Sequence, residues 1–189
     1  MLQLIQELDW TILHGIRDTL QCGPLDVLMP KITMLGDGGA VWLAASFGLM
    51  LSKKYRKYGC MMLGALAAGG LAVAWGRCLL CGNLLLKPLI GRIRPFNVQD
   101  AITLLIAAPL DYSFPSGHTL CSVIGAYMLT AANRKFGLAA IPLAALIAFS
   151  RLYLYVHFPS DVLASLSIGM LIGKLTTTAA DSMSRRTRQ

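Results

Sequence analysis

Long apolar segments, separated by short polar ones, follow one another along most of the chain. A helix needs about 20 apolar residues to cross a bilayer, because about 30 Å of hydrocarbon is crossed at about 1.5 Å per residue. The pattern therefore predicts an all-α fold, a polytopic bundle of five membrane-spanning helices, with six as the alternative. Four predicted spans are continuous, residues 59–86, 116–133, 136–155 and 161–178, and the fifth, residues 27–51, is interrupted by Gly36-Asp37-Gly38-Gly39.

Residues 2–20 show a different pattern, in which leucine or isoleucine recurs at every fourth position from Leu4 to Leu20 among many polar residues. A narrow apolar stripe is typical of a helix that lies in the membrane interface. We expect residues 1–22 to form this amphipathic helix, residues 27–178 the bundle and residues 179–189 a basic cytoplasmic tail. No repeat, low-complexity segment or linker divides residues 1–189, which predicts one membrane-embedded domain.

Composition supports a bilayer as the surroundings of this chain. Hydrophobic residues make up 56% of it and charged residues 14%, with a mean hydropathy of +0.61, whereas soluble domains have about 45–50% and about 25%. A net charge of +8 on a soluble domain would suggest nucleic acid. Here the charge accompanies long apolar segments, so we expect membrane lipids as partners and no nucleic acid.

The positions of the basic residues predict the orientation of the bundle. Of 17 lysines and arginines, four lie in residues 53–57, two are Arg134 and Lys135, and four lie in residues 174–188. With five spans all three groups fall on one side, and such clusters are typical of the cytoplasmic side. The N-terminal helix, the loop of residues 87–115 and the turn near residues 156–160 are then predicted to face outward from a bacterial plasma membrane.

The five cysteines give little sign of metal binding. Cys78 and Cys81 form a C-x-x-C pair, but no second pair or nearby histidine completes a zinc site. Packing as small hydrophobic side chains is the better interpretation. We expect neither a metal nor another cofactor.

Four other bases, Lys87, Arg92, Arg94 and Arg151, fall at the predicted outer ends of spans. Lys87 and Arg94 are seven residues apart, about two helical turns, so both could point the same way, although Pro88 and Pro95 disturb a regular helix. Such a cluster fits either a phosphate site or a positive patch that holds lipid headgroups.

A second motif, Pro115-Ser116-Gly117-His118, comes directly before an apolar segment. Proline is favoured in the first turn of a helix, where unpaired backbone N–H groups can bind an anion, and glycine leaves room for a phosphate oxygen. His118 could then supply a proton to a leaving group. The alternative is an ordinary capped helix with an incidental histidine.

A third motif contains Ser150, Arg151, His157 and Asp161. Asp161 lies four residues after His157, so it can hydrogen-bond one ring nitrogen and leave the other free to attack. The alternative is an ion pair between His157 and Asp161 within the bundle. Arg151 argues against it, because it would be a third charge for two partners.

These three motifs, KxxxxxxRP, PSGH and SRxxxxxHxxxD, resemble those of the type-2 phosphatidic acid phosphatase and vanadium haloperoxidase superfamily. They occur in the family's order, and the resemblance covers residues 30 to 175. It implies that Lys87, Arg94 and Arg151, with Ser116 and Gly117, hold the phosphate. It further implies that His157 forms a phosphohistidine, Asp161 steadies it, His118 protonates the leaving group and water completes hydrolysis. Three fixed cations can balance the phosphoryl charge, so no metal is needed.

Two features depart from this pattern or fall outside it. Many relatives have glycine where this chain has Tyr155 and Ser165, which predicts a narrower approach to His157. Asp37 and Arg77 fall inside predicted spans, where charges are costly, and we expect them to form an ion pair.

The sequence therefore predicts an integral membrane lipid phosphatase. The expected substrate is undecaprenyl pyrophosphate, because a compact chain with an outward-facing site suits the recycling of a cell-wall carrier. Phosphatidylglycerol phosphate and phosphatidic acid are the alternatives. A noncatalytic lipid-binding or transport protein is less favoured because the motifs are complete, and haloperoxidase chemistry because that activity belongs to soluble members.

Overall fold

The computed structural model describes residues 2–69, 86–99 and 102–186, and within these ranges every regular element is a helix. The predicted all-α fold is confirmed for this part of the chain. The helices are α1 (Leu2–Leu20), α2 (Gly23–Leu35), the 3-10 helix η1 (Asp37–Gly39), α3 (Ala40–Leu51), α4 (Arg56–Gly69), α5 (Leu86–Ile90), α6 (Pro95–Val98), α7 (Gly117–Ala132), α8 (Arg134–Tyr153) and α9 (Pro159–Arg186).

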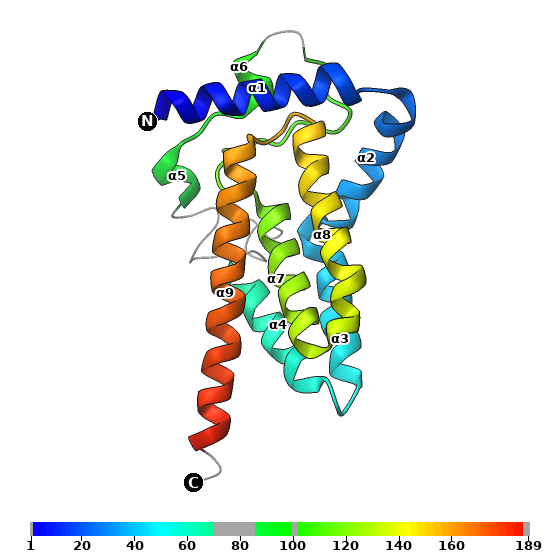
Figure 1. The fold of residues 1–189 in the computed structure, drawn as a ribbon, viewed down its shortest axis with the longest axis vertical. Helices are drawn as coiled ribbons and strands as arrows, with labels where there is room; N and C mark the ends of the chain where they lie inside the picture. The colour runs from blue at the N-terminus through cyan, green and yellow to red at the C-terminus, as the bar shows by residue number, and fades with distance from the viewer. Residues whose placement is uncertain (1, 70–85, 100–101, 187–189) are drawn as a thin grey trace.

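The long helices run side by side, with α7 packed between α8, α9 and α4, and α1 lies across one end of them (Figure 1). The main core forms where these helices meet. Its largest fully buried side chains include Trp42, Met62, Leu66, Leu120 and Ile124. The bundle therefore has two unlike ends, one covered by α1 and one that carries the turns between helices.

The described helices agree in part with the predicted spans. α8 and α9 are each long and apolar enough to cross a membrane; α2 with η1 and α3 is a third such unit, bent by 44°. The bend lies where the interrupted span was predicted, and Gly38 and Gly39 adopt left-handed backbone there. α9 continues to Arg186, so it extends past residue 178, where the bundle was predicted to end.

The second predicted span, residues 59–86, is described only in part. α4 covers its beginning, up to Gly69, and residues 70–85 lie outside the described residues. α7, the third predicted span, is 16 residues long and starts at Gly117.

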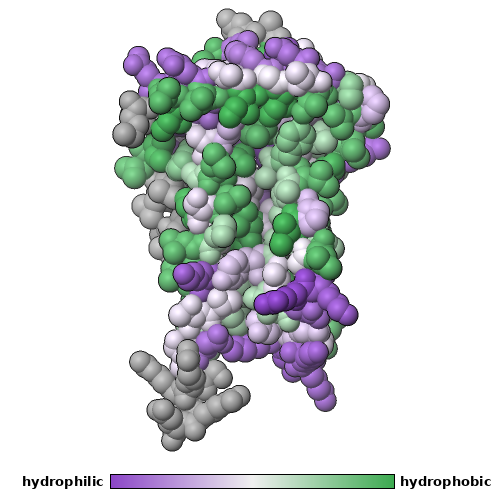
Figure 2. Space-filling view, viewed as in Figure 1, coloured by the Kyte–Doolittle hydropathy of each residue, from purple (hydrophilic) through white to green (hydrophobic). Residues whose placement is uncertain are grey.

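Helix α1 presents its apolar stripe away from the rest of the protein. Leu4, Leu8 and Ile12 are 59%, 54% and 46% exposed, whereas Asp9 and Leu13 face the bundle and are buried. Figure 2 shows a hydrophobic band beneath the hydrophilic outer edge of α1, continuous with the hydrophobic side of the bundle. The stripe that predicted an interfacial helix is therefore free to contact lipid.

The three groups of bases predicted to share one side lie at one end of the bundle, except for Arg188, which is outside the described residues. The α3–α4 turn, the α7–α8 turn and the C-terminal part of α9 all lie at the end away from α1 (Figure 1). Hydrophilic surface gathers at that end, below the hydrophobic band (Figure 2). At this end Lys57 of α4 also pairs with Asp181 of α9, at 3.4 Å.

Candidate active site

Residues of the three sequence motifs come together around one cavity of about 520 Å³ at the α1 end of the bundle. Its lining includes Lys87, Arg94, Gly117, His118, Arg151 and His157, together with Asp37 and Asp111 and apolar side chains of α2 and of residues 105–109. The motifs are up to 70 residues apart in the sequence, from residue 87 to residue 157. The fold thus brings together six of the eight predicted site residues at the cavity surface.

The three cations of the site are buried, which is unusual for lysine and arginine. Lys87, Arg94 and Arg151 are 3%, 3% and 4% exposed. α5 ends at Ile90 and Gly91 has a φ of 59°, so the chain turns sharply between Lys87 and Arg94 and no regular helix aligns them. Burial of three like charges is costly unless anions balance them, so this arrangement favours binding of a multivalent anion.

Asp111 supplies one of these anions. Its carboxylate accepts hydrogen bonds from Lys87 Nζ and from Arg94 Nη2, the latter at 2.6 Å. Burial acts to raise the pKa of Asp111, but Lys87 and Arg94 outweigh it and lower that pKa to about 2. Sequence reasoning missed Asp111, although one acid after nine residues of a mainly apolar stretch, residues 102–110, was a usable signal.

Arg151 has a different set of contacts. Its Nη1 donates to Thr33 Oγ1 of α2 at 2.5 Å, and its Nε has no hydrogen-bond partner among the described residues. It thus keeps donor capacity for a ligand in the cavity.

The start of α7 is built as a capped helix beside the cavity. Ser116 is the N-cap residue; its side-chain oxygen accepts from Thr119 N, and its own N–H donates to Ser165 Oγ at 2.8 Å. Ser116 is fully buried and does not line the cavity, whereas Gly117 does. The predicted helix start at the PSGH motif is therefore confirmed, and Pro115 lies just before it.

His118 projects from the first turn of α7 toward the bend between α2 and α3. Its Nε2 lies 2.8 Å from Asp37 Oδ1. A Cβ added to Gly36 would lie 2.8 Å from His118 Cδ2, so a side chain at residue 36 would collide with the imidazole. The bend in the first span thus contributes an acid and a close-packed backbone to the site.

The expected Asp37–Arg77 ion pair concerns a residue outside the described ones, because Arg77 lies in residues 70–85. What the structure shows for Asp37 is its contact with His118 at the cavity.

His157 lies in the α8–α9 connection with its Nε2 toward the cations. Arg94 Nη1 is 3.2 Å from this nitrogen, and a guanidinium can only donate, so Nε2 carries the lone pair and the proton is on Nδ1. Burial, followed by the charges of Arg94, Arg151 and Lys87, holds the pKa of His157 well below its usual range. The side chain is therefore a neutral imidazole with its reactive nitrogen facing the cations.

The predicted hydrogen bond between His157 and Asp161 is not formed. His157 Nδ1 and Asp161 Oδ2 are 3.7 Å apart, beyond hydrogen-bond distance, and Nδ1 has no other partner in the described part of the chain. Asp161 accepts instead from the backbone N–H of Phe158 at 2.9 Å and from Arg92 Nη1 at 2.7 Å. Both partners keep the carboxylate turned toward the start of α9.

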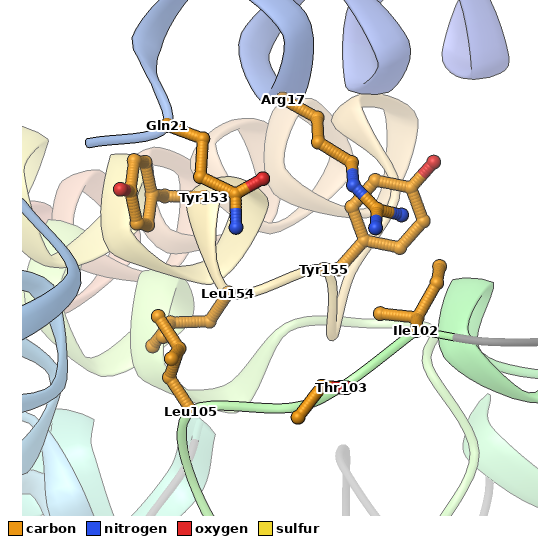
Figure 3. Close-up of a pocket in the computed structure, with 8 residues that line it drawn as sticks. All are labelled: Arg17, Gln21, Ile102, Thr103, Leu105, Tyr153, Leu154 and Tyr155. Carbon is orange, nitrogen blue, oxygen red and sulfur yellow. The ribbon is translucent and has the colours of Figure 1, made fainter. Parts of the chain in front are cut away.

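The expected narrowing by Tyr155 and Ser165 is not found, because both side chains point elsewhere. Tyr155 turns toward α1, its ring under the Arg17 guanidinium (Figure 3), and its hydroxyl donates to Gln99 Oε1 at 2.9 Å. Its φ of 60° explains why glycine suits this position. Ser165 supports the α7 cap through its bond with Ser116 N.

No group of three histidine, cysteine, aspartate or glutamate side chains that could hold a metal occurs among the described residues. The cavity lining combines three cations and two imidazoles with the carboxylates of Asp37 and Asp111, and this surplus of basic groups suits an anion.

The sequence profile of the PAP2 superfamily matches residues 58–182. The chain belongs to the PAP2 superfamily. This match covers most of the chain, including all three motifs, and confirms the resemblance inferred from them.

Two curated relatives are undecaprenyl-diphosphatases. The protein of that name from Sulfolobus acidocaldarius is 32% identical over 137 residues, which cover 72% of this chain and 62% of that protein. The undecaprenyl-diphosphatase BcrC of Bacillus subtilis is 32% identical over 136 residues, with the same two shares. The matched part of this chain thus spans about three fifths of the length of either relative.

Two solved structures share the fold. The transmembrane PAP2 type phosphatidylglycerolphosphate phosphatase of Bacillus subtilis has a TM-score of 0.72 and 25% identity, covering 95% of this chain and 87% of that one. LpxE of Aquifex aeolicus has a TM-score of 0.73 and 24% identity, covering 90% and 95%. The bundle is therefore a PAP2 membrane phosphatase fold.

Proposed function

We propose that the protein is an integral membrane lipid phosphatase that works through a phosphohistidine. The observation that carries this proposal is the cavity in which three buried cations meet two histidines, one of them neutral with its free nitrogen toward the cations. Fixed cations stabilise the charge of a transferring phosphoryl group without reorganising during the reaction.

In the first step the lone pair of His157 Nε2 attacks phosphorus, and the bond from phosphorus to the leaving oxygen breaks. His118 gives its proton to that oxygen, and Lys87, Arg94 and Arg151 hold the three other oxygens. In the second step His118 takes a proton from water, whose oxygen attacks phosphorus, so that phosphate is released and His157 is regenerated. No step requires a metal.

Undecaprenyl pyrophosphate is the first substrate to test, because two relatives that are 32% identical to this chain carry the name undecaprenyl-diphosphatase. Phosphatidylglycerol phosphate is the second candidate, because the structure of a phosphatidylglycerolphosphate phosphatase aligns with 95% of this chain. The apolar side chains of α2 and residues 105–109 at the cavity suit a substrate that carries a hydrocarbon chain.

We further propose five spans, the end with the basic turns in the cytoplasm and α1 in the outer interface of a bacterial plasma membrane. The exposed stripe of α1 supports this placement, because Leu4, Leu8 and Ile12 would otherwise face water. The cavity then opens near the outer leaflet.

The test is phosphate release from undecaprenyl pyrophosphate, phosphatidylglycerol phosphate and phosphatidic acid by the purified protein in EDTA. We expect release that survives chelation and is abolished in His157→Ala. In His118→Ala, lipid hydrolysis should fall by about 100-fold or more, and hydrolysis of p-nitrophenyl phosphate much less, because nitrophenolate leaves without a proton.

The outcomes separate the candidates. Trapping of labelled phosphate on His157 in the parent supports the covalent route, and the ranking of the three lipids gives the substrate. Binding of these lipids without turnover, or equal activity in parent and His157→Ala, would instead make the protein a lipid-binding member of the family.

A further inference from the structure

Helix α1 contacts residues 155–161, the segment that contains His157 and Asp161, through one buried acid. Asp9 is 2% exposed although it lies on a helix that covers the surface of the bundle. Its Oδ1 accepts from the backbone N–H of Ser160 at 2.8 Å, and its Oδ2 accepts from Ser160 Oγ at 2.5 Å. Ser160 lies in the first turn of α9, directly before Asp161. An acid on α1 therefore holds the start of the helix that carries Asp161.

Arg92 links this acid to Asp161. Its Nη2 donates to Asp9 Oδ2 at 2.6 Å, and its Nη1 donates to Asp161 Oδ1 at 2.7 Å. The guanidinium also lies over the ring of Phe158, 4.0 Å from its centroid. One planar cation is thus fixed on three sides by α1, by the start of α9 and by the residue after His157.

The charges of Asp9, Arg92 and Asp161 do not cancel, and the excess negative charge lies near His157. Asp9 and Asp161 are two buried carboxylates and Arg92 is one cation, so the cluster retains one negative charge. His157 can balance this charge once its ring is protonated or phosphorylated, since Nδ1 lies 3.7 Å from Asp161 Oδ2. How strongly Asp161 attracts that charge depends on how tightly Arg92 holds it.

A second contact of α1 supports the same segment from the other side of His157. Arg17 lies over the ring of Tyr155 at 5.7 Å, and Trp10 packs against the rings of Tyr155 and Phe158 (Figure 3 shows Arg17 and Tyr155). Tyr155 has left-handed backbone, which is unfavourable for a residue with a side chain and needs surrounding contacts to hold it. α1 therefore contacts the chain both before and after the nucleophile.

We propose that Asp9 and Arg92 are positioning residues that act through Asp161 on His157. Helix α1 then contributes to the active site through Asp9. This inference rests on the proposed phosphatase function. It assigns Arg92, the base of the cluster that the family motif leaves without a role, to the support of the nucleophile.

The two positioning residues should act in opposite directions. Removal of the charge of Arg92 leaves the Asp161 carboxylate free to interact with Nδ1–H, which makes His157 more basic. Removal of the charge of Asp9 leaves Arg92 with one acidic partner, which weakens Asp161 as an acceptor and makes His157 less basic. The other charged groups that face His157 are unchanged in both variants: Lys87, Arg94, His118 and Arg151.

The experiment compares Arg92→Met, Arg92→Lys and Asp9→Asn with the parent and with Asp18→Asn, which removes an acid from an exposed position on the same helix. We expect Arg92→Met to lower kcat by about 10- to 100-fold with little change in KM, because the loss of the guanidinium that fixes Asp161 outweighs the gain in basicity of His157. Arg92→Lys should recover part of this loss, and Asp18→Asn should behave as the parent. Thermal unfolding in detergent checks that each variant is folded.

A second measurement does not depend on turnover. The rate at which diethyl pyrocarbonate modifies His157, followed by mass spectrometry against pH, reports the neutral imidazole. The midpoint of this pH dependence should rise in Arg92→Met, fall in Asp9→Asn and stay unchanged in Asp18→Asn. Unmoved midpoints in both variants would overturn the proposal even if activity falls. A parent that hydrolyses no lipid would overturn the proposed function, while the midpoints would still decide the role of Asp9 and Arg92.

Discussion

At the scale of single residues, the Asp111 carboxylate lies where a substrate phosphate is expected to bind. It already bonds to Lys87 and Arg94, which the family motif assigns to phosphate. A substrate dianion must therefore displace this carboxylate or share the two cations with it, and repulsion between the two anions weakens binding.

We therefore expect Asp111→Asn to bind inorganic phosphate more tightly. The gain should be about tenfold in the inhibition constant, about 1.4 kcal/mol, because one repelling charge is removed and the shape is kept. Competitive inhibition by phosphate measures it, with Asp181→Asn at the opposite end of the bundle as the control. Weaker inhibition in Asp111→Asn would mean that Asp111 instead holds the two cations in place.

His157 makes stability depend on pH. Burial and the neighbouring cations hold the pKa of His157 well below the value of about 6.5 that it has when unfolded. Between these two pKa values the unfolded chain binds the additional proton, so stability is complete above pH 6.5 and falls as pH falls through this window.

The melting temperature of the parent in detergent should thus fall more between pH 7 and pH 5 than that of His157→Asn, which has no proton to gain. His14→Asn, at an exposed position on α1, should follow the parent. Parallel curves for the parent and His157→Asn would contradict the account of a buried neutral imidazole.

At the scale of elements, α1 has two faces with different surroundings. Leu13 is fully buried in a cluster with Tyr155 and Phe158, whereas Leu8 is 54% exposed on the apolar stripe. The buried face packs on Tyr155 and Phe158, on either side of His157, and the exposed face is available to lipid.

Leu13→Ala should therefore destabilise the protein in detergent by about 2–4 kcal/mol, while Leu8→Ala should cost less than about 0.5 kcal/mol. Chemical unfolding of both variants measures the difference. Equal losses would show that the stripe around Leu8 also packs on protein, which would contradict an interfacial α1.

At the scale of the whole molecule, the two ends of the bundle carry different groups. The basic turns lie at one end, and the cavity with α1 lies at the other (Figure 1). A membrane orients such a bundle through its basic end, and the site then faces the opposite compartment.

We expect an impermeant maleimide to label Leu110→Cys in intact spheroplasts and to label Lys135→Cys only after lysis, both in a background without the native cysteines. Leu110 is fully exposed beside the cavity, and Lys135 lies at the start of α8 at the basic end. Labelling of Lys135→Cys alone in intact spheroplasts would reverse the proposed orientation.

The sequence by itself determined the all-helical fold of the described residues, the gathering of the described bases at one end and the three motifs. These features depend on local spacing. The length of the apolar segments predicts α8 and α9, and the glycines at 38 and 39 predict the bend. Ser116 is an N-cap residue and predicts the start of α7. The family could be inferred from the same short patterns, because each motif places its residues within about a dozen positions.

Only the tertiary structure decided which charged groups meet. Asp37, Asp111, Arg92 and Asp9 contact partners 17 to 151 residues away, and spacing along one helix carries no information on such contacts. The same cause explains the wrong prediction for His157 and Asp161: a spacing of four residues brought them close, but Arg92 and Phe158 N–H compete for the carboxylate. The fold that brings these charges together makes each of them depend on its neighbours in space.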